Sequence, residues 1–138
     1  MKLIFCLDDK GGMMFNKRRQ SQDRELRKRI LDTLEGKPLV MSPYSAKQFV
    51  ESENILISDA PQIENFDGVY FVEDLPFFLR GVDEITIYKW NRLYPSDVKF
   101  DTDLTQNGFV LSNVFEFEGS SHEKITEEKY IKGDGALC

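Results

Sequence analysis

Short apolar runs separated by turn residues recur along the chain and predict a sheet of buried strands. Residues 2–7 form the first run, which ends at Asp8 and Asp9 and is continuous in the way that is typical of a central strand. The later runs that predict strands are 38–41, 54–58, 68–73 and 83–90. Gly, Pro, Asn or Asp residues flank these runs and set their limits.

Apolar residues at helical spacing indicate one longer helix over residues 21–35. The residues of its apolar face are Leu26, Ile30, Leu31 and Leu34. Ser21 is a favourable N-cap, Asp23 suits the positive end of the helix dipole, and Gly36 suits the C-terminus. A turn with a short helix is predicted over 42–52, and another short helix over 74–81.

The C-terminal part of the chain differs, because it holds two long strand-like segments. Residues 109–118 and 122–132 flank Gly119-Ser120-Ser121, which predicts an antiparallel hairpin. Strands interleaved with helices and followed by a hairpin predict an α/β fold, with a central, mostly parallel sheet, flanking helices and a C-terminal antiparallel hairpin. Residues 1–138 are expected to form a single domain.

Composition narrows the class of protein. Of 138 residues, 41% are hydrophobic and 12% aromatic, which indicates a packed core. No apolar run approaches the roughly 20 residues that a membrane span needs, so no membrane partner is expected. The two cysteines, Cys6 and Cys138, do not suggest a disulfide framework, and a cytoplasmic location is expected. The net charge of −6 argues against general nucleic-acid binding, although a local basic site stays open.

A basic segment, residues 17–29, stands out because it holds seven basic and two acidic residues. The basic residues of this segment that lie within the predicted helix are expected to form its solvent-exposed face. Lys17, Arg18 and Arg19 precede the helix and predict a cradle for a small anion such as a phosphate or nucleotide. The Ser21 hydroxyl would add a donor to this cradle. Nucleic-acid binding by the whole segment is the alternative.

Asp8 and Asp9 end the first strand, at the edge where open α/β sheets bind ligands. The cradle is expected to lie over this edge, and a polar turn before Gly11 is the other interpretation of the two aspartates. No spacing of His, Cys, Asp or Glu indicates a metal site, and no Gly-Lys-Ser/Thr ending marks a phosphate loop. His122, the single histidine, is expected to be exposed in the hairpin loop rather than catalytic.

Several segments resemble the dihydrofolate reductase family in their order and residues. The segment LIFCLDDKGGM is similar to the family's first strand and turn, and EGKPLVMSPYSAKQF is similar to the stretch after its first helix. The most specific run is Gly36 to Met41, GKPLVM, and the C-terminal segments are similar to the family's terminal hairpin. The resemblance covers nearly the whole chain and implies the dihydrofolate reductase fold.

The residues that carry the family's chemistry are not retained. The position of its catalytic carboxylate falls on Leu26, with Glu25 one residue earlier as the possible carboxylate. Residues 19–21, Arg-Gln-Ser, stand where the family has Leu-Pro-Trp. Phe5 and Cys6 replace the small residues beside its pteridine.

The residues at the positions of the family's cofactor site also differ from the family pattern. Pro43 replaces the family's phosphate-contacting Arg, although Ser45 matches the neighbouring hydroxyl. Only one strand, 83–90, is found where the family has two with a Gly-Gly helix start between them, and that start binds pyrophosphate. The resemblance therefore implies a shortened, divergent fold member that is not a working reductase and that binds a small anionic or nucleotide-like ligand. No catalytic residue and no cofactor is assigned from the sequence.

Overall fold

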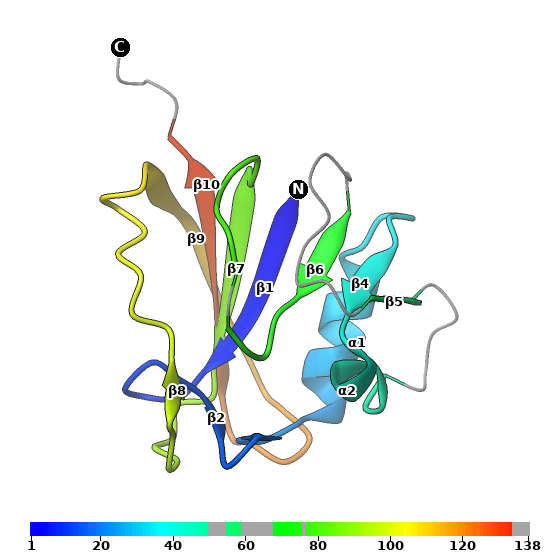
Figure 1. Cartoon of the computed structure of the whole chain (residues 1–138). Coiled ribbons are helices and arrows are strands. Elements are labelled where there is room, and N and C mark those ends of the chain that lie inside the picture. Colours follow the sequence, from blue (N-terminus) through cyan, green and yellow to red (C-terminus); the bar gives the residue numbers. More distant parts are fainter. Residues whose placement is uncertain (50–54, 59–67, 76, 134–138) are drawn as a thin grey trace.

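Seven strands form the central sheet. The computed structural model describes residues 1–49, 55–58, 68–75 and 77–133. The strands of the sheet are β1 (Lys2–Leu7), β4 (Leu39–Met41), β5 (Ile55–Ile57), β6 (Val69–Phe71), β7 (Glu84–Lys89), β9 (Phe109–Phe117) and β10 (Ile125–Lys132). They lie side by side in the order β5-β4-β6-β1-β7-β10-β9 (Figure 1).

The direction of the strands matches the predicted fold class. From β5 to β7 every neighbouring pair is parallel, with β1 between β6 and β7. β10 runs antiparallel to β7 and to β9, and the β9–β10 hairpin has one irregularity between Lys129 and Tyr130. The α/β fold with a mostly parallel sheet and a C-terminal antiparallel hairpin is confirmed.

The longer helix is α1 (Arg24–Asp32), and its N-cap lies two residues later than predicted. Its N-cap is Asp23, whose carboxylate accepts the N–H groups of Glu25 at 2.9 Å and Leu26 at 3.2 Å. The prediction of Ser21 as N-cap is therefore wrong, because the carboxylate satisfies the free N–H groups of the first turn. Buried Leu26 and Ile30 confirm the predicted apolar face.

The shorter helix, α2 (Pro43–Ala46), begins after Ser42, whose hydroxyl accepts the Ser45 N–H. It confirms the start of the helix that was predicted over 42–52, of which residues 50–52 lie outside the described part. Cys138, with the rest of 134–138, also lies outside it. Pro43 fits the first turn because no N–H is needed there.

The connection between β6 and β7 corrects two expectations. One strand was predicted where the dihydrofolate reductase family has two. The structure has two strands there, β6 and β7, one on each side of β1, so the predicted loss of a strand is wrong. The predicted helix at 74–81 is also wrong, since residues 74, 75 and 77–81 form a bend, an irregular stretch and a turn rather than a helix. Phe77 packs edge-on against Phe5, with ring centroids 4.8 Å apart, so a tertiary aromatic contact outweighs local helix preference here.

A small second sheet was missed by the sequence analysis. It joins β3 (Arg18–Arg19), β2 (Gly12–Phe15) and β8 (Val98–Lys99) in that order. Asn16 and Lys17 form the turn between β2 and β3, both with positive φ, at 52° and 61°. Two-residue strands carry no alternation of apolar and polar residues, so the pattern predicted a loop.

The core fills both faces of the central sheet. Leu3, Phe5 and Leu7 of β1 pack on one face with residues of β2 and β7, whereas Ile4 packs on the other face with α1. Exposed apolar residues gather on β9, the outer strand, and these are Val110, Leu111, Val114 and Phe115. Within the described ranges, no helix has the length and apolar character of a membrane span.

Candidate functional site

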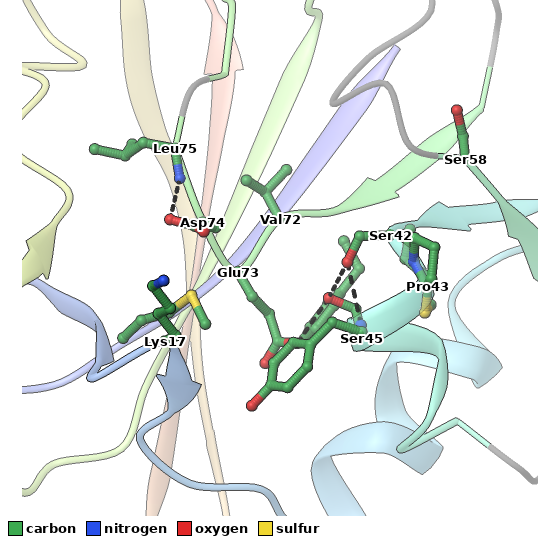
Figure 2. A pocket seen from close by; sticks show the side chains of 13 residues that line it. Lys17, Ser42, Pro43, Ser45, Ser58, Val72, Glu73, Asp74 and Leu75 are labelled. Atoms are coloured by element: carbon green, nitrogen blue, oxygen red, sulfur yellow. Dashed lines mark hydrogen bonds between the residues drawn. The ribbon is translucent and has the colours of Figure 1, made fainter.

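A cavity of about 540 Å³ opens at the carboxyl ends of β4 and β6, beside α2 (Figure 2). Its polar lining residues are Lys17, Ser42, Ser45, Ser58, Glu73 and Asp74. Its apolar lining includes Met14, Met41, Phe71, Val72 and Leu75. Carboxyl ends of parallel strands are where α/β sheets bind ligands, and apolar walls with a few polar groups are typical of small-molecule sites.

Glu73, which lines this cavity, binds Arg19. The Arg19 Nε donates to Glu73 Oε2 at 3.0 Å, and its Nη2 reaches Oε1 at 3.3 Å. The guanidinium also lies over the Tyr44 ring, 4.4 Å from its centroid, and Ser45 Oγ donates to Glu73 Oε1 at 2.7 Å. The charge of Arg19 is thereby matched by a carboxylate, which reduces what it can offer to an anion.

Of the three predicted cradle cations, Lys17 is the one that lines the cavity. It approaches from the β2–β3 turn, while Ser42 and Ser45 lie on the α2 side (Figure 2). Arg18 is exposed on β3. The structure therefore brings Lys17 to the cavity, pairs Arg19 with Glu73 of its lining, and leaves Arg18 exposed.

Asp8 is buried and holds the turn that follows β1. Its carboxylate accepts N–H groups from Gly12 at 2.7 Å, Lys10 at 2.9 Å and Tyr94 at 3.1 Å, and the Gln20 amide at 3.0 Å. Burial alone would raise the pKa of Asp8, but these hydrogen bonds outweigh it and hold the pKa below its usual value.

Little space is left around the Asp8 carboxylate. A Cβ on Gly12 would lie 2.8 Å from Asp8 Oδ2. Asp9 is exposed, and both aspartates line a separate cavity of about 360 Å³ rather than the one beside α2. The structure therefore does not bring them together with Lys17.

A buried polar cluster joins the segment before α1 to the β9–β10 loop. Asp23 Oδ2 is 2.9 Å from His122 Nδ1, and the Asp23 carboxylate also accepts the N–H groups of Ser120 and Ser121, both at 2.9 Å. Burial acts to raise the pKa of Asp23, but hydrogen bonds from Ser120, His122 and Ser121 hold it well below its usual range. Gly119 has no room for a side chain, since its Cβ would meet Asp23 Oδ2 at 2.5 Å.

His122 corrects the expectation of an exposed loop histidine. It is only 4% exposed, and its ring stacks on Trp90 with centroids 4.5 Å apart. Its Nε2 lies 3.0 Å from Ser21 Oγ and 3.1 Å from the Tyr94 hydroxyl. No local sequence signal reveals this cluster, because 99 residues separate Asp23 from His122.

The place of the reductase carboxylate is apolar in this protein. Leu26 is 2% exposed within the apolar cluster beneath α1, and the adjacent Glu25 is half-buried. Cys6 borders the same cluster, and burial and the negative charge of Glu73 raise the pKa of its thiol against the opposing effect of Arg19. The thiol is therefore protonated at neutral pH and is not poised as a thiolate nucleophile.

One helical cation of the basic segment also has a structural partner. Arg29 donates twice to buried Glu127, at 2.9 and 3.0 Å, and Tyr88 donates to the same carboxylate at 2.8 Å. Burial would raise the pKa of Glu127, but the hydrogen bonds from Arg29 and Tyr88 lower it overall. Arg29 therefore joins α1 to β10, in contrast to the solvated role expected for the helical cations.

Comparison with known proteins supports the fold alone. No family model and no curated protein matches the chain. Among solved structures, it is similar to a dihydrofolate reductase from Enterococcus faecalis, in complex with NADP(H) and RAB-propyl, with a TM-score of 0.67 and 10% identity over 96% of each chain. The chain therefore has a dihydrofolate-reductase-like fold, as the resemblance implied.

Proposed function

We propose that the protein binds a small anionic or nucleotide-like ligand in the cavity beside α2 and is not a dihydrofolate reductase. The observation that carries the proposal is the cavity itself, whose lining combines Lys17 and serine hydroxyls with several apolar side chains. Lys17 would contact the anionic group, and the apolar wall of Met14, Met41 and Phe71 would accept a flat ring. The structurally similar reductase was solved with NADP(H), which makes a nucleotide-like ligand a reasonable class.

The charge balance of the cavity favours a ligand with little negative charge. Arg19 is paired with Glu73, and Asp74 adds a second carboxylate to the lining. The segment 72–83, which joins β6 to β7, contains no Gly-Gly pair, and its described residues form no helix. A pyrophosphate would therefore meet two carboxylates where a helix N-terminus would otherwise stabilise it, so one phosphate or carboxylate fits better.

The case against reductase activity depends on the proton donor. Leu26 occupies the position that the resemblance implies for the catalytic carboxylate, and it is buried among apolar residues. Glu25 is the adjacent residue, and neighbouring helical residues point about 100° apart. Purified protein is expected to show no NADPH-dependent dihydrofolate reduction above the background rate. Turnover clearly above that background would refute this part of the proposal.

Isothermal titration calorimetry with AMP, adenosine and NADP⁺ tests the binding site. We expect AMP to bind, and Lys17→Gln to weaken its binding about 3- to 10-fold, the effect of one charge-assisted contact at a partly exposed site. Adenosine binding should not change in that variant. Lys28→Gln is the matched control, because Lys28 is an exposed cation on α1. If none of the three compounds binds, or if Lys17→Gln leaves AMP binding unchanged, the proposed site is wrong.

The alternative function, nucleic-acid binding through residues 17–29, has less support. Arg19 and Arg29 are engaged by Glu73 and Glu127, so the basic surface is smaller than the sequence suggests. Such binding would weaken steeply as salt increases. Retention of RNA or DNA at low salt, with that salt dependence, would favour this alternative.

A further inference from the structure

Ser21, His122 and Asp23 form a chain of hydrogen bonds with the connectivity of a serine nucleophile, its base and an orienting acid. Ser21 Oγ lies 3.0 Å from His122 Nε2, and His122 Nδ1 lies 2.9 Å from Asp23 Oδ2. Each contact uses the ring nitrogen that such a system requires, and this geometry rather than the fold identifies the arrangement. We propose that Ser21 is a nucleophile, activated by His122 and Asp23, that reacts with small acyl or phosphoryl electrophiles.

The orientation of the imidazole is fixed from several directions. The Asp23 carboxylate is immobilised by the N–H groups of Ser120 and Ser121, both at 2.9 Å, so it can only accept from His122. Nδ1 therefore carries the proton of the neutral ring, and Nε2 presents its lone pair toward Ser21. Stacking on Trp90, with an interplanar angle of 26°, fixes the plane of the ring.

Tyr94 is a competitor for the same nitrogen. Its hydroxyl lies 3.1 Å from His122 Nε2, and the single lone pair of Nε2 accepts one hydrogen bond at a time. When Tyr94 donates, the Ser21 hydroxyl loses its base. Removing the Tyr94 hydroxyl should therefore increase the reactivity of Ser21, although it removes a hydrogen bond from the folded protein.

The step that we infer is balanced without a metal or redox partner. As the Ser21 Oγ attacks, its proton moves to His122 Nε2, and Asp23 stabilises the imidazolium that forms. With an alkyl fluorophosphonate, an Oγ–P bond forms, the P–F bond breaks and fluoride leaves with the bonding electrons. With an ester, an Oγ–C bond forms, the C–O bond to the alcohol breaks, and the leaving alkoxide takes the proton from the imidazolium. Ser21 is half-buried, which favours small electrophiles over large ones.

Labelling by a fluorophosphonate, followed by intact mass and peptide mapping, tests the proposal. We expect one adduct, on Ser21, and none in Ser21→Ala. His122→Gln should slow labelling about 100-fold, the contribution of a general base. Tyr94→Phe should speed labelling about 2-fold, because it frees the lone pair of Nε2. Ser112→Ala, which removes an exposed hydroxyl on β9, is the matched control and should keep labelling within about 2-fold of the parent protein.

Three outcomes would overturn the proposal. The first is the absence of any adduct on the folded parent protein, and the second is an adduct at a serine other than Ser21. The third is an equal labelling rate in folded His122→Gln. If His122→Gln does not fold, as judged by circular dichroism, the comparison of Ser21→Ala with Tyr94→Phe decides, and slower labelling in Tyr94→Phe then contradicts the proposal.

Discussion

Asp8 and Asp23 are both buried aspartates, but they stabilise the protein in different ways. Asp8 accepts backbone N–H groups from two residues nearby in the chain and from the distant Tyr94. It also accepts the side-chain amide of Gln20. Asp23 caps α1, holds the β9–β10 loop and orients His122. The Asp8 partners are amide N–H groups, whereas one Asp23 partner is the imidazole of His122, whose other ring nitrogen can accept a proton. A buried carboxylate becomes part of possible chemistry when one of its partners can itself carry or release a proton.

The largest expected effect follows from removing Asp23. Asp23→Ala leaves the first turn of α1, the loop N–H groups and His122 without their acceptor, so we expect the free energy of unfolding to fall by about 3–5 kcal/mol. Urea denaturation followed by circular dichroism measures this change. Asp9→Ala is the control, because Asp9 is exposed, and it should change stability by less than about 0.5 kcal/mol. An Asp23→Ala effect as small as the control would contradict the role of Asp23.

Removing Asp8 should have a smaller effect. Asp8→Ala deprives the turn around Gly12 of its acceptor, and we expect a loss of about 2–3 kcal/mol. The effect is smaller because Asp8, unlike Asp23, caps no helix. Asp8 also holds fewer groups from distant parts of the chain than Asp23 does. The same urea experiment measures it. If Asp8→Ala destabilises more than Asp23→Ala, the comparison between the two sites is reversed.

Acid should weaken both sites. The pKa of each carboxyl is lowered in the folded protein, so each contributes stability that is complete above the unfolded value of about 3.9 and is lost as pH falls toward the folded value. From pH 5 to pH 3 we expect a loss of about 1 kcal/mol from Asp23 and a loss of the same sign from Asp8. Urea denaturation of Asp8→Asn and Asp23→Asn across this range measures it, and each variant should lose less stability than the parent. A variant as acid-sensitive as the parent protein would show that its carboxyl does not contribute.

The smallest effect is expected at Tyr94, which touches both sites. Its N–H donates to Asp8 and its hydroxyl lies against His122. Tyr94→Phe keeps the first contact and removes the second, so a loss of about 0.5–1.5 kcal/mol is expected. In a double-mutant cycle, Tyr94→Phe should couple to His122→Gln and add independently to Gln20→Ala, which weakens Asp8 instead. Equal coupling to both variants would mean that the Asp8 site and the Asp23–His122 site are energetically coupled.

Sequence reasoning located elements better than it located sites. The run at residues 2–7 and the hairpin around Gly119 have strong local patterns, and both were confirmed. The helix expected at 74–81 failed because Phe77 packs against Phe5 and Phe100, contacts that no local pattern contains.

The polar sites were harder to predict for the same reason. Lys17 was predicted as part of an anion cradle, since a run of cations in an acidic chain is visible in sequence, and it lines the cavity beside α2. The partners of Asp23 and Arg29 come from β10 and the loop before it, about 100 residues away, so their pairing depends on the complete fold. Whether the cradle binds a ligand stays a prediction.

Gly12 and Gly119 are positions where the protein tolerates no side chain without a local rearrangement. Each lies against one of the two buried carboxylates, and a single methyl group at either position would enter the space of the oxygen that it faces. Alanine at residue 119 would therefore act on Asp23 much as a substitution of Asp23 itself would. The contribution of each aspartate therefore depends on its glycine, and a variant that replaced the glycine would lose much of what the aspartate contributes.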